Sequence, residues 1–167
     1  MGDLYVGCNA NSTGGTKVAT AAQLSDYAPI ANPAFTGSIS LGRKANTTVG
    51  INSSAVGNNV EASGDYSHAE GAGTVASGEY SHAEGSGTTA SGVLSHAEGA
   101  NSNAINTSTH AEGAGTTASG VYSHAEGVGT IAGGPYSHAE GVSTKAYGDF
   151  SHAEGASVVA LGALSHV

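Results

Sequence analysis

A 14-residue repeat dominates this chain. From Ser67 onward the motif S-H-A-E-G-x-G-T-x-A-S-G-x-Y recurs without an insertion. Its histidines are His68, His82, His96, His110, His124, His138, His152 and His166. A glutamate follows two residues after all but the last, at Glu70, Glu84, Glu98, Glu112, Glu126, Glu140 and Glu154. An unbroken period leaves no room for variable loops, so the sequence predicts a solenoid with one turn for each copy.

Weaker copies precede the regular ones. Residues 53–66 form one more copy, in which Ser54 and Val56 replace the histidine and the glutamate. A fainter copy around residues 38–50 carries one extra residue. The pattern therefore predicts an all-β repeat domain over residues 38–167, preceded by an attachment or connector segment over residues 1–37.

Each copy divides into two halves of seven residues, and we expect a short strand and a turn from each half. Side chains alternate between the two faces of a strand. The small residues Ser67, Ala69 and Gly71 are expected inside, which leaves His68 and Glu70 on the other face. The alanines predicted to pack inside are Ala69, Ala76, Ala83, Ala90, Ala104, Ala118, Ala132, Ala146 and Ala160. Such uniform alanine predicts a narrow roll.

The glycines of the repeat are expected to mark turns. Asn106 stands where the other copies have glycine, and asparagine tolerates left-handed backbone angles better than most residues. A positive φ is therefore predicted at residue 106 and its equivalents. Eight copies at a strand spacing of ~4.8 Å would stack over roughly 40 Å. Each copy buries mostly methyl groups, worth ~0.8 kcal/mol apiece, so an isolated chain should be marginally stable.

Composition excludes several classes of protein. The chain has no Trp, and its formal net charge of −9 offers no basic surface for phosphates, so we expect no nucleic-acid partner. It has no run of about 18 apolar residues, which predicts no membrane insertion. A calcium-binding β-roll requires aspartate at fixed turn positions, whereas the repeats contain only Asp65 and Asp149, so calcium is not implied.

The repeat resembles the head domain of trimeric autotransporter adhesins, the YadA-like head. That family repeats approximately S-V-A-I-G, and Ser53 to Gly57, S-S-A-V-G, is similar to it. The resemblance implies a left-handed parallel β-roll that forms homotrimers. The family's Val and Ile face the trimer interface, and their positions correspond to His68 and Glu70. The resemblance thus implies an interface ladder between three chains, formed by the histidines from His68 to His152, all seven glutamates, and Tyr66, Tyr80, Tyr122 and Tyr136.

A second resemblance concerns the N-terminal segment. Tyr27 to Gly37, Y-A-P-I-A-N-P-A-F-T-G, is similar to a connector of bacteriophage tail-fibre proteins, and S-H-A-E-G repeats resemble those of phage and prophage structural proteins. These likenesses imply a virion fibre, in its shaft or head, that spaces and presents a host-contacting tip. Residues 1–37 would bind other virion proteins. The alternative is a bacterial-surface adhesin whose β-roll binds a host glycan or matrix protein directly.

The repeated polar residues permit other interpretations. An active site needs differentiated groups in one environment, whereas these are identical copies, so we expect no enzyme, no catalytic residue and no cofactor. Histidines from three chains could bind metal ions, but a hydrogen-bonded ladder that fixes register is favoured, and no metal is predicted. The aromatic column could bind sugars, but packing between chains is favoured. That column contains Tyr66, Tyr80, Leu94, Ser108, Tyr122, Tyr136, Phe150 and Leu164.

Overall fold

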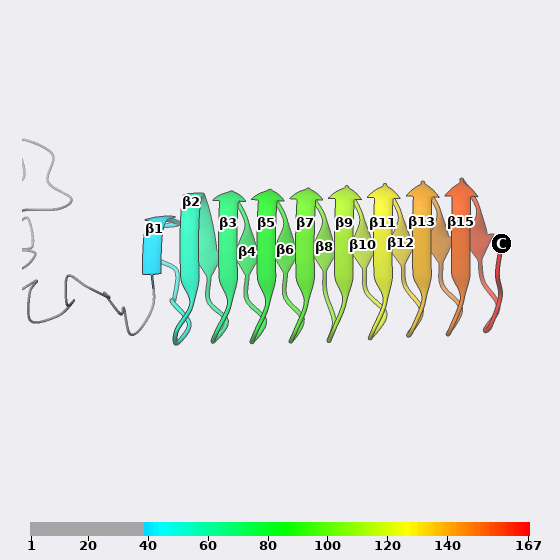
Figure 1. Cartoon of the computed structure of the whole chain (residues 1–167), viewed down its shortest axis with the longest axis horizontal. Helices are drawn as coiled ribbons and strands as arrows, with labels where there is room; N and C mark the ends of the chain where they lie inside the picture. Colours follow the sequence, from blue (N-terminus) through cyan, green and yellow to red (C-terminus); the bar gives the residue numbers. More distant parts are fainter. Residues whose placement is uncertain (1–38) are drawn as a thin grey trace, which may run out of the picture. The chain divides into compact units, whose positions relative to one another are not determined.

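The structure, a computed structural model, describes residues 39–167 as a β-solenoid (Figure 1). Sixteen strands form this region, and the described pairings between them are parallel. The predicted all-β parallel solenoid of 14-residue repeats is therefore confirmed. No helix capable of crossing a membrane occurs in this part of the chain. The connector predicted over residues 1–37 lies outside the described residues, and the left hand of the coil stays an expectation from the family resemblance.

Each turn from β3 onward contributes one long and one short strand. The long strands are β1 (Ile39–Arg43), β2 (Ser54–Ala62), β3 (His68–Ala72), β5 (His82–Ser86), β7 (His96–Ala100), β9 (His110–Ala114), β11 (His124–Val128), β13 (His138–Val142) and β15 (His152–Ala156). The short strands are β4 (Val75–Ala76), β6 (Thr89–Ala90), β8 (Asn103–Ala104), β10 (Thr117–Ala118), β12 (Ile131–Ala132), β14 (Lys145–Ala146) and β16 (Val159–Ala160). Long strands stack on long strands and short strands on short ones, with β2 taking part in both stacks.

The register between regular turns matches the sequence period. Each residue pairs with its equivalent in the next turn, as His124 does with His138. The first pair of strands differs, because Ile39 pairs with Ser54 and the register shifts again between Leu41 and Arg43. The extra residue expected in the first copy is thus accommodated where β1 meets β2.

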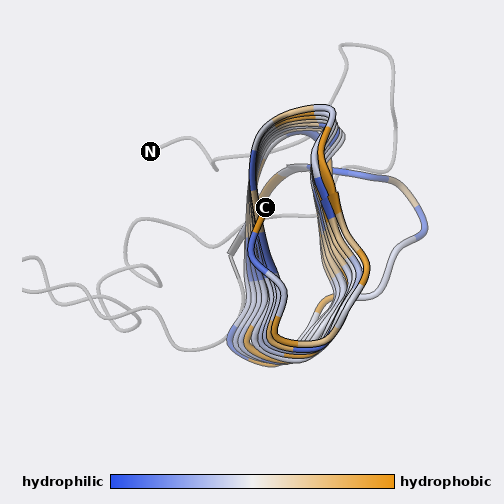
Figure 2. Ribbon diagram, turned by 90° about the vertical axis from the view of Figure 1, so that its right-hand side faces the viewer, coloured by the Kyte–Doolittle hydropathy of each residue, from blue (hydrophilic) through white to orange (hydrophobic). Residues whose placement is uncertain are grey.

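Small side chains fill the interior of the solenoid, whose turns lie one behind another in the view along the stack (Figure 2). The alanine columns of the long and short strands are 0–1% exposed from Ala55 to Ala160. Val60, in the first full turn, is the largest fully buried side chain. Buried hydroxyls close the turns, as where Ser67 Oγ donates to the carbonyl oxygen of Gly64 at 2.6 Å. The fully buried side chains of residues 39–167 are therefore no larger than valine and threonine.

The turns correct two predictions made from the sequence. Gly71 is exposed, with φ near +110°, so the strand alternation ends there and the residue does not face inward. Asn106 has a negative φ, as do its glycine equivalents such as Gly120. Glycine is needed there for close approach, because a Cβ on Gly120 would lie 1.9 Å from the carbonyl oxygen of Gly134. The left-handed positions are instead Gly73 and Tyr66, with their equivalents.

Hydrogen bonds join successive turns in the corners as well as in the strands. The Tyr80 amide donates to the Asp65 carbonyl at 2.9 Å, and the Gly87 amide donates to the Ala72 carbonyl at 2.8 Å. These bonds run between adjacent turns of the solenoid, so the corners belong to the same continuous stack. This explains why the repeat tolerates no insertion between residues 67 and 166.

Candidate functional site: a stripe of histidine and glutamate

The long strands bring the histidines from His68 to His152 and all seven glutamates to one outer face, and a β-bridge to His152 adds His166. The residue between them in each strand, such as Ala69, is buried, so His68 and Glu70 both point outward. Because the strands pair in register, histidine stacks on histidine and glutamate lies beside glutamate. The eight histidines from His68 to His166 and the seven glutamates from Glu70 to Glu154 are called the His/Glu stripe below.

The imidazole rings of the stripe form a continuous column. Consecutive ring centroids are 4.6–4.9 Å apart. From His82 to His166 the interplanar angles are at most 10°, whereas His68 meets His82 at 62°. The stacked rings cover one another's faces, and their Nε2 atoms lie toward the carboxylates.

Imidazole nitrogens and carboxylate oxygens alternate along the stripe. His124 Nε2 lies 4.0 Å from Glu112 Oε1, in the preceding turn, and 3.8 Å from Glu126 Oε2, in its own turn. Glu112 also contacts His110, with its Oε2 3.7 Å from His110 Nε2. One carboxylate thus lies between two imidazoles, and one imidazole lies between two carboxylates.

Most of these contacts are longer than hydrogen bonds. His152 Nε2 lies 3.2 Å from Glu140 Oε1, which is within hydrogen-bonding distance. Several of the other imidazole–carboxylate distances are 3.4–4.0 Å, beyond the usual range for such a bond. Inaccessible Nε2 atoms without a hydrogen-bond partner occur in His82, His96, His110, His124 and His138. Within one chain, few hydrogen bonds therefore join the histidines to the glutamates.

Burial and neighbouring imidazoles favour the neutral form of two histidines. Desolvation lowers the pKa of His82 below its ordinary value of 6.5, and His96 and His68 lower it further. The pKa of His124 is lowered in the same way, by desolvation and then by His110 and His138. Nearby glutamates oppose both shifts without reversing them. A neutral imidazole leaves one ring nitrogen with a free lone pair.

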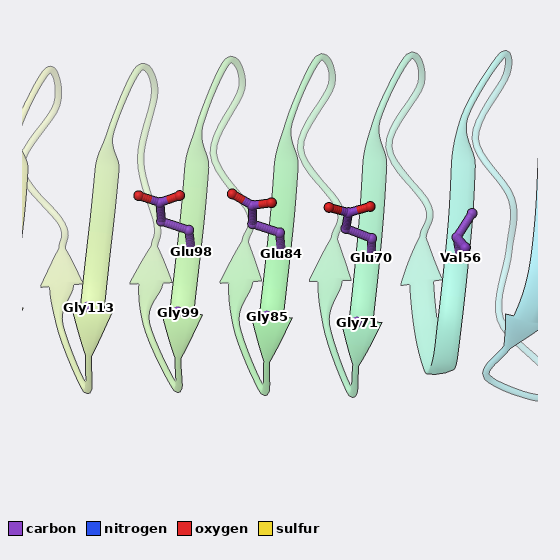
Figure 3. Close-up of a pocket in the computed structure, with 8 residues that line it drawn as sticks. All are labelled: Val56, Glu70, Gly71, Glu84, Gly85, Glu98, Gly99 and Gly113. Atoms are coloured by element: carbon purple, nitrogen blue, oxygen red, sulfur yellow. The ribbon is translucent and has the colours of Figure 1, made fainter.

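An open groove of about 620 Å³ runs beside the stripe. The carboxylates of Glu70, Glu84 and Glu98 project along it in one row, and Val56 occupies the same position in the preceding turn (Figure 3). Backbone of Gly71 and its equivalents forms the other part of the lining. The groove was not predicted from the sequence, because Gly71 was placed inside. Its character is acidic, because glutamates of three consecutive turns line it.

The aromatic column lies at the corner before each long strand. Tyr66 is 50% exposed and Phe150 58% exposed. Tyr66 stacks on Tyr80 with centroids 5.0 Å apart, and Tyr136 stacks on Phe150 at 4.8 Å. The column has φ of 54–60°, a left-handed conformation that its bulky residues rarely adopt and that the sequence pattern did not indicate. Within residues 39–167, no hydrogen bond links the tyrosine hydroxyls to the stripe.

Stacking changes what the aromatic column can bind. A sugar packs against the face of an aromatic ring, but Tyr122, Tyr136 and Phe150 cover each other's faces at interplanar angles of 12° and 1°. The exposed ring edges remain available for apolar contacts with another protein chain. The geometry therefore favours packing between chains over sugar binding. The predicted interface ladder itself stays a prediction, since its test requires the assembled protein.

Fold and stripe together define a β-solenoid repeat protein with a polar outer column. A comparison with known protein families matches residues 36–59, 83–105 and 111–137 to the YadA head domain repeat (2 copies). The matched residues are thus similar to YadA head domain repeats, which are of a structural, adhesin-like kind. No match was found among curated proteins.

Proposed function

We propose that this chain is a structural fibre protein: the shaft or head of a homotrimeric fibre that spaces and presents a host-contacting tip. One observation carries the proposal, namely the unbroken parallel register from β2 to β16. Every turn is hydrogen-bonded to the next around both strands and corners. Such a stack resists bending and carries no differentiated catalytic centre along residues 39–167, which suits a spacer.

The outer face of the long strands supports trimerisation. Five Nε2 atoms lack a partner within one chain, and buried polar atoms are normally satisfied. The adjacent aromatic column exposes Tyr80, Tyr122 and Phe150 to about half their surface. Two further chains would cover both features. Tyr80, Tyr136 and the stripe would then form the interface ladder between chains.

Absolute molar mass tests the assembly. Light scattering from the full chain at neutral pH should give three times the chain mass of 16.1 kDa, hence about 48 kDa. A stable particle of one chain mass would overturn the trimer and leave the stripe on a solvent-facing surface. A dimer would equally contradict the proposal, because a trimer axis requires three stripes.

The fibre is proposed to belong to a phage or prophage virion, on the basis of the connector-like residues 27–37. Antibody raised against the repeat region should label purified virions, and labelling confined to intact cell surfaces would contradict this location.

A second candidate is an adhesin on the bacterial surface, which the family match favours. In that case the repeat region itself binds a host glycan or matrix protein. Glycan and matrix-protein arrays probed with the full chain would then show saturable binding. A variant that lacks exposed ring edges, Tyr122→Ser with Tyr136→Ser, would lose this binding. Absence of binding by the unchanged chain would count against the adhesin and leave the spacer.

A further inference from the structure

We propose that the His/Glu stripe binds divalent transition-metal ions, such as Zn²⁺, Ni²⁺ and Co²⁺, through alternating imidazole and carboxylate ligands. Borderline ions of this kind accept both imidazole nitrogen and carboxylate oxygen. The inference does not depend on the fibre role, because each proposed site takes both ligand types from one chain.

The spacing of the ligand atoms fits a coordination shell better than it fits a hydrogen bond. Two ligands ~2.1 Å from one ion lie about 3.0 Å apart in an octahedron and about 3.4 Å apart in a tetrahedron. His68 Nε2 lies 3.4 Å from Glu70 Oε2, and His110 Nε2 lies 3.7 Å from Glu112 Oε2. The partly exposed glutamate side chains can shift by the few tenths of an ångström that separate these distances from those in a coordination shell.

The unit of the site is one histidine with the carboxylates on either side of it. His124 is the clearest case, because Glu112 and Glu126 approach its Nε2 from the two sides at 4.0 and 3.8 Å. His124 and His138 are stacked with an interplanar angle of 2°, so their Nε2 lone pairs run side by side and do not converge. One ion therefore takes one imidazole and one or two carboxylates, and water completes its shell.

Charge in the stripe favours cations. Neighbouring carboxylates at ~4.8 Å repel each other by about 0.9 kcal/mol even at the dielectric constant of water. No lysine or arginine of residues 39–167 forms an ion pair with the stripe, and the Lys44 ammonium lies 4.0 Å from Glu61, outside it. The carboxylates of Glu70, Glu84 and Glu98 lie side by side along the groove, next to Gly71 and Gly85.

Repulsion between bound ions limits the number that bind tightly. Two divalent ions one turn apart would repel each other by about 3.5 kcal/mol in water. Every second site, each made of one histidine and its neighbouring carboxylates, should therefore fill first. This gives about three or four tightly bound ions for the seven sites. The remaining sites should bind metal ions at least tenfold more weakly.

The test is a titration of the full chain, freed of metal by a chelator, with Co²⁺. Calorimetry should show about three or four tight ions per chain, and visible absorption should show ligand-field bands that indicate nitrogen ligands. Replacing the four central histidines, His96, His110, His124 and His138, by glutamine should lower the number of tight ions to about two. The matched control is Glu79→Gln with Asp149→Asn, which removes charge away from the stripe and should leave the number unchanged.

Two results would overturn the proposal. Complete displacement of Co²⁺ by 10 mM Mg²⁺ would show a diffuse carboxylate atmosphere without imidazole coordination. The same number of tight ions in the glutamine variant would exclude the stripe as the site. If that variant fails to fold, Zn²⁺ is added to the unchanged chain, and its imidazole ¹⁵N resonances are recorded. Shifted Nε2 signals support the proposal, and unshifted signals refute it.

Discussion

Substituting Gly120 by alanine should destabilise the solenoid far more than the same change at Gly115, five residues away. Gly120 has an ordinary negative φ, but its Cβ would lie 1.9 Å from the Gly134 carbonyl oxygen in the next turn. Gly115 has φ of +65°, and its Cβ would meet no atom within 4 Å. The two positions thus separate close approach between turns from left-handed backbone conformation.

Asn106 shows how the stack accommodates a side chain at the position equivalent to Gly120. The Gly120 amide donates to the Ala132 carbonyl at 3.1 Å, but no equivalent bond joins the Asn106 amide to Ala118. The Asn106 side chain instead donates from Nδ2 to the Ser119 carbonyl at 2.5 Å. Asparagine therefore replaces the lost backbone bond with a side-chain bond, which alanine cannot do.

The magnitudes follow from these contacts. A carbon–oxygen contact needs about 3.3 Å, so Gly120→Ala must move the turns apart by roughly 1.4 Å. Overpacking costs ~1–3 kcal/mol and the lost hydrogen bond ~1 kcal/mol, for a total of about 2–4 kcal/mol. Gly115→Ala should cost about 1 kcal/mol, from the left-handed conformation alone. Gly120→Asn should recover about 1 kcal/mol relative to alanine.

Urea denaturation followed by far-ultraviolet circular dichroism, at one protein concentration for all variants, measures these differences. The reasoning is refuted if Gly120→Ala and Gly115→Ala agree within about 0.5 kcal/mol. It is equally refuted if Gly120→Asn is as damaging as Gly120→Ala, because the side-chain bond seen at Asn106 would then contribute nothing.

Three further predictions use the same denaturation assay. In chelator-treated buffer, acidification from about pH 7.5 to about pH 5.5 should lower the urea midpoint of unfolding. The pKa of His82 and of His124 lies below 6.5 in the folded chain, so the unfolded chain takes up more protons. A flat or rising midpoint would contradict this. Ala104→Val should lower the free energy of unfolding by ~1–3 kcal/mol, because Ala104 is fully buried. Asn103→Val, on the outer side of the same strand, should change it by less than about 0.5 kcal/mol. Equal effects would argue against a narrow interior. Ser108→Gly should stabilise by about 0.5–1 kcal/mol, since Ser108 has φ of 54° and no stacked ring to lose, and a lower midpoint would contradict the strain argument.

The repeat period was sufficient to predict the fold because it acts at every turn. A spacing of 14 residues fixes which residue pairs with which, as His124 pairs with His138. The small residue types then identify the inside, where Ala69 and Ala76 are fully buried. Even the extra residue of the first copy was readable, and it appears as the offset pairing of Ile39 with Ser54.

The errors arose where one residue type serves two purposes. Glycine permits a positive φ, and it also permits close approach of two backbones. The sequence does not say which purpose applies. A left-handed conformation is therefore predicted at Asn106, where φ is negative, and is missed at Tyr66, where φ is positive. Gly71 was placed inside by extending the strand alternation one residue beyond the point where the backbone bends.

The details of the stripe were beyond sequence reasoning for a different reason. The period places histidine over histidine, but rotamers decide whether His124 Nε2 meets Glu112 or Glu126, and it approaches both. Rotamers also decide that the rings stack face to face, which leaves Nε2 of His138 without a partner. The residue types alone therefore do not show how many hydrogen bonds the stripe forms within one chain, and the ladder predicted between chains stays a prediction.

The turn that contains Val56 shows what the change to histidine and glutamate means for assembly. Val56 pairs with Glu70 and occupies the same outward position, yet it is 37% exposed and has no polar group to satisfy. Apolar side chains there are stabilised by burial alone, so their contribution does not depend on protons or ions. The turns from His68 onward instead present groups that bind protons, metal ions or partner side chains. Acid and chelators should therefore loosen the turns from β3 to β15 before the turn formed by β2, and hydrogen exchange resolved by turn can measure that order.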